Sequence, residues 1–281
     1  MHEDDRDLMH EDHRELPVTS SIEPAWAPEA RDCYRGVVQA LQQADVPFAV
    51  SGGFAFHRHT GIWRATKDLD LVLPPSAIPQ AIQVLESQGF ETNIQDAVWL
   101  AKAWRQDYFV DLITGVGNAT LPVEQSWIDR ALSDDVLGIP CKVLRAEELI
   151  ASKLFVTRRE RFDGADIAHL LKSCGRRLDW GWLLQLVEPH WEMLYWELVL
   201  FAYIYPAHVD LVPGALWSSF AQRFKDRVSQ PEKDAPFRGT LVDPKMFAID
   251  VNEWGERDLY RERCENYPCL LEIEKSFGSL E

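Results

Sequence analysis

The chain has 281 residues, of which 46% are hydrophobic and 26% are charged, and its formal net charge at pH 7 is -16. This is the composition of a globular protein with enough length for one large domain or two small ones. A net charge of this sign repels polyanions, which argues against constitutive binding of duplex DNA, so any nucleic acid would need a local basic patch.

Predicted helices and strands alternate in the first half of the chain. Residues 1–25 are acidic and lack the apolar core of a signal peptide, so we expect a disordered tail. Helices are predicted at 28–44, from about 53 to 60 and at 76–88, with Gly89 ending the third. Strands are predicted at 46–50, 68–73, 97–104, 107–113 and 141–144. This order predicts an α/β (α+β) protein with a small mixed sheet.

From Ala146 onward the apolar pattern becomes helical, with helices predicted at 146–159, 163–173, 180–187, 191–205 and 214–228. Residues 191–205 are almost continuously apolar but contain two glutamates, and a membrane span needs about 20 apolar residues. We therefore expect a buried helix and no membrane association. The predicted units are a catalytic domain at 26–145, a helical domain at 146–228 that completes the site, and an irregular extension at 229–281.

The cysteines indicate a reducing compartment. Their number is odd, and no two of them form a CxxC pair: Cys33, Cys141, Cys174, Cys264 and Cys269. This pattern is typical of free thiols and not of a disulfide framework or a zinc site. We therefore expect a cytoplasmic protein.

Three aspartates are candidates for a metal site. Asp68 and Asp70 are two residues apart on a predicted strand, so their side chains share one face at a separation of about 7 Å. Asp111 lies on another predicted strand and is the preferred third carboxylate. Two magnesium ions about 4 Å apart would use such carboxylates and leave other positions to phosphate oxygens and water. Asp107, at a strand start, and the pair Asp134-Asp135, expected in a turn, are alternatives.

A glycine pair precedes the aspartates. Ser51-Gly52-Gly53 follows a predicted strand and opens a helix. Glycine permits a tight turn and a close approach of backbone N–H groups to a triphosphate, and the helix N-terminus favours negative charge. A lone glycine pair or a lone Asp-x-Asp occurs in many folds, so it is their order and spacing that point to a nucleotide site.

Together, Ser51-Gly52-Gly53, Asp68-Leu69-Asp70 and Asp111 resemble the signature of the polymerase-beta-type nucleotidyltransferase superfamily. More narrowly, Glu147 to Leu171 is similar to the AbiEii-like nucleotidyltransferases, the toxins of type IV toxin-antitoxin systems and their relatives. In that group a lysine-bearing helix precedes an Asp-x-x-Asp helix, which here corresponds to Lys153 and Asp163-Gly164-Ala165-Asp166. The resemblance covers about residues 30 to 175.

The resemblance implies a catalytic role for Lys153 and Asp166. From the residues alone, Lys153 lies on an apolar helical face and needs an anion there, unless its stem lies along apolar surface with the ammonium in water. Asp163 and Asp166 are either functional or simply favoured by the dipole of a first helical turn. The resemblance favours Asp166, as a group that orients Lys153 or the acceptor hydroxyl.

Several other polar residues are weaker candidates. Arg64 and Thr66 precede the first aspartate and are placed to reach a phosphate. His57 and His59 diverge on a short helix, which argues against joint metal ligation, and we expect them at the surface. The basic runs are read as solvated helix faces: Arg158, Arg159 and Arg161, then Lys172, Arg176 and Arg177.

The sequence thus predicts an enzyme that transfers a nucleoside monophosphate from an NTP to an acceptor hydroxyl with the help of two Mg²⁺ ions. The acceptor is left open among an RNA end, a protein side chain and a small molecule. Two alternatives stand beside this prediction: an AbiEii-like toxin with an antitoxin partner, and a catalytically silent module that binds nucleotide or a partner protein.

Overall fold

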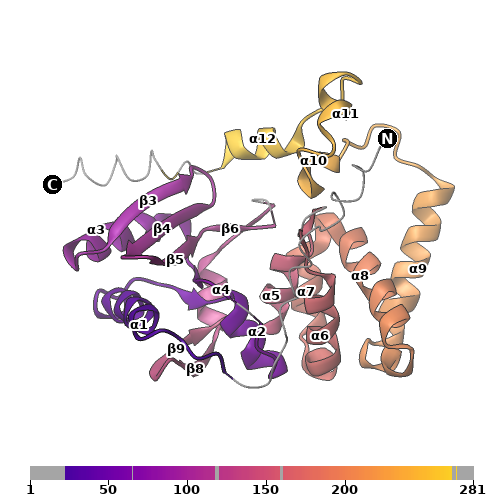
Figure 1. The fold of residues 1–281 in the computed structure, drawn as a ribbon. Helices are drawn as coiled ribbons and strands as arrows, with labels where there is room; N and C mark the ends of the chain where they lie inside the picture. Colours follow the sequence, from indigo (N-terminus) through magenta and orange to yellow (C-terminus); the bar gives the residue numbers. More distant parts are fainter. Residues whose placement is uncertain (1–22, 65, 118–119, 159–160, 268–269, 271–281) are drawn as a thin grey trace, which may run out of the picture.

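A seven-stranded sheet is followed by a set of helices that stands beside it (Figure 1). This computed structural model describes residues 23–64, 66–117, 120–158, 161–267 and 270. Residues 1–22, which make up most of the predicted acidic tail, lie outside the described residues.

The main sheet has the strand order β3-β4-β5-β2-β1-β9-β8. Its strands are β1 (Ala49–Val50), β2 (Leu69–Val72), β3 (Glu91–Asp96), β4 (Leu100–Arg105), β5 (Tyr108–Ile113), β8 (Leu132–Val136) and β9 (Ile139–Val143). β2 runs parallel to β5 and β1 to β9, whereas the other neighbouring pairs are antiparallel. The predicted α/β class with a mixed sheet is therefore confirmed.

Helices α1 (Pro28–Gln43) and α3 (Ile78–Ser87) pack on one face of the β3-β4-β5 part of this sheet. Side chains alternate between the two faces of a strand, so every second residue of β4 and β5 points at these helices. Those residues are fully buried: Ala101, Ala103, Val110 and Leu112. The residues between them, Asp111 included, point to the other face.

The helical part begins at α5 (Ala146–Lys153), which contacts α2 (Gly52–Thr60) of the sheet part as well as α6 and α7. The remaining helices are α6 (Gly164–Cys174), α7 (Trp180–Val187), α8 (Trp191–Ile204) and α9 (Gly214–Ser229). Short 3-10 turns lie at Pro75–Ala77, Gly175–Arg177, Glu188–His190 and Pro206–Leu211. Because α5 contacts both parts, it carries its residues to the boundary between them.

Two small strand pairs and a helix occupy stretches where no such elements were predicted. They are β6 (Gly115–Val116) with β7 (Leu121–Pro122), β10 (Thr157–Arg158) with β11 (Arg161–Phe162), and α4 (Gln125–Arg130). The helix predicted at 146–159 is therefore too long, since the chain leaves it after Lys153 and enters the β10-β11 pair.

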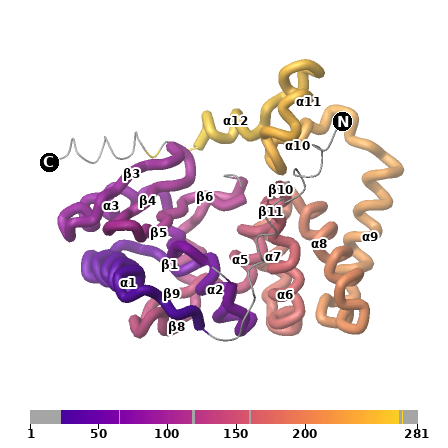
Figure 2. The backbone as a smooth tube through the Cα atoms, viewed as in Figure 1, coloured from indigo at the N-terminus to yellow at the C-terminus, as the bar shows by residue number. Residues whose placement is uncertain are grey.

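The predicted irregular extension contains three short helices, α10 (Gly239–Val242), α11 (Ala248–Asn252) and α12 (Leu259–Asn266). Figure 2 shows it running across the top of the molecule from α9 back toward β3 and β6. Arg263 donates to the Thr120 carbonyl at 2.8 Å, and the Tyr267 hydroxyl donates to the Thr114 carbonyl at 3.2 Å. These bonds hold the extension against the sheet part.

Helix α8 differs from the prediction of a buried helix. Leu194, Leu198 and Phe201 are fully buried, but Trp196 and Tyr203 on its other side are exposed. Aromatic residues lie on both sides of this helix, so the stretch is almost continuously apolar in sequence. Its composition therefore does not reveal that one side of the helix is exposed. In the described part of the chain, no helix is both long and apolar enough to cross a membrane.

Candidate active site

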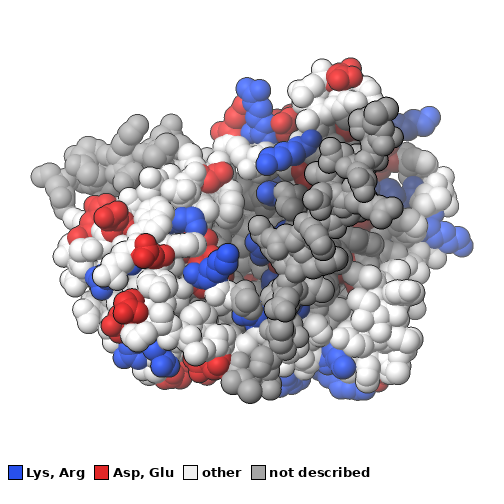
Figure 3. Space-filling view, viewed as in Figure 1, with Lys and Arg blue, Asp and Glu red and all other residues white. Residues whose placement is uncertain are grey.

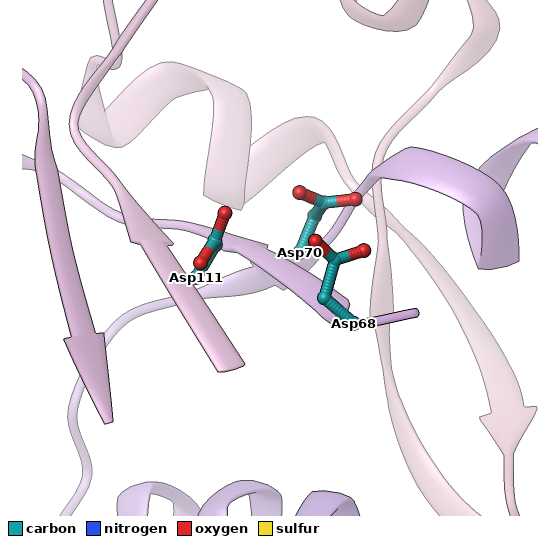
Figure 4. Close-up of side chains that lie close together, drawn as sticks. All are labelled: Asp68, Asp70 and Asp111. Carbon is teal, nitrogen blue, oxygen red and sulfur yellow. The ribbon is translucent and has the colours of Figure 1, made fainter. Parts of the chain in front are cut away.

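Three carboxylates meet on the face of the sheet that points away from α1 and α3 (Figure 4). Asp70 lies on β2 directly opposite Asp111 of the parallel strand β5, and Asp68 stands just before β2. One oxygen from each lies within 4.8 Å of the others. The structure thus brings together the three aspartates that the sequence analysis selected, in an arrangement that fits a divalent cation.

The electrostatics of this cluster are unfavourable without a cation. Burial, followed by the charges of Asp68 and Asp111, raises the pKa of Asp70 to about 7. Burial also raises the pKa of Asp111, against the opposing hydrogen bond and charge of Lys102. Like charges packed this closely repel one another unless positive charge lies between them.

Lys102 supplies positive charge at one end of the cluster. It lies on β4 directly opposite Asp111, and its ammonium donates to Asp111 Oδ1 at 2.6 Å. The same ammonium lies 3.9 Å from the centre of the Phe109 ring. Lys102 therefore fixes the orientation of the Asp111 carboxylate.

The glycine turn lies directly against Asp70. The Ser51 N–H donates to the Asp70 carbonyl at 2.8 Å, and α2 begins at the next residue. Gly52 has φ +55°, and a Cβ atom there would lie 1.7 Å from Asp70 Oδ2. Gly53 is also tightly placed, because a Cβ atom would lie 3.3 Å from Thr66 Cβ. Glycine at position 52 is therefore needed both for the backbone conformation and for the Asp70 carboxylate.

Thr66 holds the first aspartate, whereas Arg64 lies away from the cluster. The Thr66 hydroxyl donates to Asp68 Oδ1 at 3.1 Å, so it contacts a carboxylate. Arg64 forms an ion pair with Asp166 and lies 3.4 Å from His169 Nδ1. To reach a phosphate as predicted, Thr66 would have to leave Asp68 and Arg64 would have to leave Asp166.

Lys153 lies at the centre of a chain of alternating charges. It is 9% exposed, and its ammonium donates to Asp163 and Asp166 at 2.8 Å each. Arg161 contacts Asp163 from outside, at 3.2 Å. Burial alone would raise the pKa of Asp163, but Lys153 and Arg161 outweigh it and hold that pKa below its ordinary value. The ammonium is thus buried and paired, which rules out a lysine whose head lies in water.

The two aspartates that pair with Lys153, Asp163 and Asp166, do not act as helix caps. Asp163 occupies the N-cap position of α6, but its side chain makes no capping hydrogen bond. Asp166 lies in the first turn and uses its two oxygens for Lys153 and Arg64. Both carboxylates therefore serve to place Lys153, which has three N–H donors and uses two of them here.

A cleft of about 250 Å³ lies between the three-aspartate cluster and the charged residues around Lys153. Its polar wall carries Gly52, Asp70, Asp111, Lys153 and Arg161, and its apolar wall includes Trp99 and Val156. Arg158 and Arg161 lie on the β10-β11 pair beside it. These two arginines therefore lie on strands beside the cleft and not on a helix face as predicted, although Arg161 is exposed as expected. Arg159 of the same run lies outside the described residues.

The other candidate ligands lie apart from the cluster. Asp107 is exposed in the turn between β4 and β5. Asp134 and Asp135 are on β8, at the far edge of the sheet, and not in a turn as predicted. His57 and His59 are half-buried, so both are more covered than the predicted surface placement. His57 stacks on Trp63, and His59 contacts the Leu144 carbonyl.

Removing the Lys153 ammonium is expected to destabilise the protein. The variant Lys153→Met leaves two buried carboxylates without the cation between them, so we expect a loss of about 3 kcal/mol in the free energy of unfolding at pH 7. The loss should shrink as pH falls through the lowered pKa of Asp163, because the carboxylate then becomes neutral in both states. Urea denaturation measures both effects.

Lys225→Met, at an exposed lysine on α9, is the matched control and should change stability little. Equal stability of wild type and Lys153→Met would show that Arg64 and Arg161 suffice to balance the two aspartates.

No protein-family profile matches the sequence, and no curated protein matches it either. Similar solved structures include ANT(2'')-Ia in complex with adenylyl-2''-tobramycin, with 15% identity and a TM-score of 0.38 over 51% of this chain and 87% of that one.

Two further structures are similar at the same level. The lincomycin-bound lincosamide antibiotic adenylyltransferase LnuA has 14% identity and a TM-score of 0.36 over 49% of this chain and 93% of that one. An antigenic nucleotidyltransferase-like protein from Paracoccidioides brasiliensis has 18% identity and a TM-score of 0.34 over 64% and 94%. All these TM-scores are below 0.5.

Proposed function

We propose that this chain is a metal-dependent nucleotidyltransferase, which transfers a nucleoside monophosphate from an NTP to an acceptor hydroxyl and releases pyrophosphate. The observation that carries the proposal is the cluster of Asp68, Asp70 and Asp111, with one oxygen each within 4.8 Å, beside a glycine turn. The motif resemblance of these residues to the polymerase-beta-type superfamily supports the same assignment.

The donor set suits magnesium. Its ligands would be carboxylate oxygens, which hard divalent cations prefer, and the cluster leaves room for phosphate oxygens and water. Burial, followed by the charges of Asp68 and Asp111, raises the pKa of Asp70, and a bound cation would offset both effects. Asp68, Asp70 and Asp111 would hold two ions, which would neutralise the triphosphate and stabilise the charge that develops on the transferred phosphoryl group.

The cleft residues have separate roles in this proposal. Backbone N–H groups of Gly52 and Gly53 at the start of α2 contact the phosphates, and Ser51 sets the turn. Lys153 uses its third N–H donor for the triphosphate from the opposite wall, oriented by Asp163 and Asp166. Arg161 lines the same wall, and Trp99 offers an aromatic surface to the nucleobase.

The transfer itself is an in-line displacement. The acceptor oxygen attacks the α-phosphorus while the bond from that phosphorus to the bridging oxygen breaks, and the electron pair leaves with pyrophosphate. Asp111 takes the proton of the acceptor hydroxyl. We place the catalytic unit at residues 26–145 and propose that residues 146–228 complete the cleft, because Lys153 and Arg161 come from the second segment.

Radiolabel transfer tests this function. Purified protein is incubated with each α-labelled NTP, Mg²⁺ and a whole-cell extract, and the protein, RNA and small-molecule fractions are separated. We expect label in one fraction with the wild type, and none with the double variant Asp68→Asn, Asp70→Asn. Undiminished labelling by that variant would contradict the proposal.

The alternatives are distinguished by other outcomes. Label in the RNA or protein fraction, together with growth arrest on expression, would support an AbiEii-like toxin with an antitoxin partner. Absence of label in every fraction, with NTP binding still measurable, would indicate a silent module that binds nucleotide or a partner.

A further inference from the structure

The parts of the proposed site lie in one row across the sheet. Strands β1, β2, β5 and β4 are successive neighbours, and they bear or precede Gly52, Asp70, Asp111 and Lys102 in that order. Neighbouring strands are about 4.8 Å apart, so the row runs from the glycine turn through the carboxylates to Lys102. The carboxylates occupy the middle of this row.

This order fixes the side from which an acceptor arrives. In phosphoryl transfer the attacking and leaving oxygens lie roughly in line, on opposite sides of the phosphorus. The leaving pyrophosphate lies at the Gly52 end in the proposed function. The acceptor oxygen must therefore approach over β5 and β4, beyond Asp111.

The surface on that side is the half-buried face of β4 and β5, which carries two aromatic rings. Trp104 of β4 lies directly opposite Phe109 of β5, next to the Lys102 and Asp111 pair. All four side chains are only half-buried, whereas the residues between them are fully buried under α1 and α3. We name Lys102, Trp104 and Phe109 the β4-β5 face.

The rim of this face is polar and includes an acid. Glu91 and Asn93 of the edge strand β3 are exposed, and they lie opposite Trp104 and Lys102 respectively. The only cation of the face, among the described residues of β3, β4 and β5 that point this way, is Lys102, which already binds Asp111. On the side of the molecule drawn in Figure 3, acidic and basic side chains of the described residues are interspersed. A polyphosphate chain would find little positive charge here, and the net charge of -16 adds repulsion.

We propose that the β4-β5 face is the acceptor subsite, and that the acceptor is a small hydroxylated molecule with a planar ring that stacks on Trp104. The inference rests on the proposed function and names the class of substrate at its second subsite. Lys102 positions Asp111 at the edge of this face, so a ring seated on Trp104 carries its hydroxyl toward the Asp111 carboxylate. In this proposal Trp104 determines which acceptors bind, whereas the three aspartates take part in the transfer reaction.

The test compares two tryptophans on opposite sides of the carboxylates. Full-length wild type, Trp104→Ala and Trp99→Ala are each assayed with an α-labelled NTP, Mg²⁺ and graded amounts of the small-molecule fraction of a cell extract. For Trp104→Ala we expect half-maximal labelling to need at least about tenfold more extract, which corresponds to about 1.4 kcal/mol. The dissociation constant of a non-hydrolysable NTP analogue should stay within about twofold, because Trp104 lies outside the donor cleft.

Trp99→Ala should show the reverse pattern, since Trp99 lines the donor cleft. Its dissociation constant for the analogue should rise about fivefold, with an unchanged dependence on extract. Trp104→Phe keeps a planar ring and should stay within about threefold of wild type, which separates stacking from a general effect on folding. Trp254→Ala removes a tryptophan that is 69% exposed and should change neither quantity.

Three outcomes would overturn the inference while leaving the transferase intact. They are an equal dependence on extract for wild type and Trp104→Ala, a loss of analogue binding by Trp104→Ala as large as that by Trp99→Ala, and wild-type label found only in RNA or protein. Absence of wild-type label in every fraction would instead overturn the proposed function, and the acceptor subsite with it.

Discussion

Replacing Asp70 with asparagine is expected to abolish transfer and, at the same time, to stabilise the metal-free protein. The loss of one of the three carboxylates should lower kcat/KM at least about 1000-fold, or about 4 kcal/mol. The gain in stability has a different origin, because burial and the charges of Asp68 and Asp111 raise the pKa of Asp70 to about 7. Asparagine has a similar shape and carries no charge.

The sign of the stability effect follows from proton binding. Between the unfolded pKa of about 3.9 and the folded value of about 7, native Asp70 holds a proton that the unfolded chain releases. Stability contributed by this group is therefore complete below the unfolded pKa and is lost as pH rises through the folded one. A shift of this size corresponds to about 4 kcal/mol, which we halve to about 2 kcal/mol because the cleft admits water.

Urea denaturation in EDTA at pH 8 and near pH 4 measures the effect. We expect Asp70→Asn to exceed wild type by about 2 kcal/mol at pH 8 and by much less near pH 4. Added Mg²⁺ should then raise the stability of wild type and leave that of Asp70→Asn almost unchanged. Asp107→Asn, at an exposed aspartate outside the cluster, is the control and should keep both activity and stability. A variant less stable than wild type at pH 8 would show that cations already present in the chain balance Asp70.

The three aspartates were predictable because their placement depends on local patterns. Side chains alternate along a strand, so Asp68 and Asp70 point to the same side of β2. The predicted helix between Ser76 and Gly89 provides the long connection that parallel strands such as β2 and β5 require. Parallel neighbours then bring Asp111 beside Asp70, as their register shows. The glycine turn carried its own signal, since a paired glycine after a strand marks a close backbone approach.

Lys102 and Arg161 were not identified, because their roles depend on contacts that the local sequence does not encode. Lys102 falls within a predicted strand, but only the antiparallel register of β4 against β5 puts it opposite Asp111. The sequence predicts a helix face at Arg161, because the apolar residues Leu154, Phe155 and Val156 continue the helical pattern of α5. The chain instead turns back at this point, and β11 pairs with β10.

Strand β3 was missed for a different reason. It is an edge strand with only one neighbour, and it contains the polar sequence Glu91–Asp96, in which Ile94 is the single large apolar residue. An edge strand with one solvated face needs few apolar residues, so its composition is close to that of a loop. Its position became evident only from its pairing with β4. Without β3 the rim of the β4-β5 face could not be recognised from sequence.

Introducing a single methyl group at the glycine turn, as Gly52→Ala, is expected to abolish transfer at least as completely as loss of an aspartate. The added Cβ would lie 1.7 Å from Asp70 Oδ2 and 2.6 Å from its Cγ, so the carboxylate would have to leave its place among the three. Position 52 also has φ +55°, which costs a non-glycine residue about 1 kcal/mol or more. The variant thus combines a backbone cost with displacement of a metal ligand.

Gly61→Ala separates these two effects. Gly61 ends α2 with φ +71°, close to the backbone conformation of Gly52, but a Cβ there would meet no atom within 4 Å. We therefore expect both variants to lose about 1 to 2 kcal/mol of stability from the backbone, and only Gly52→Ala to lose transfer and Mg²⁺-dependent stabilisation. If Gly52→Ala kept its activity, the turn would have to move as a unit away from Asp70, and the triphosphate contact assigned to it would be wrong. If both variants lost activity equally, strain in α2, and not the displaced carboxylate, would be the cause.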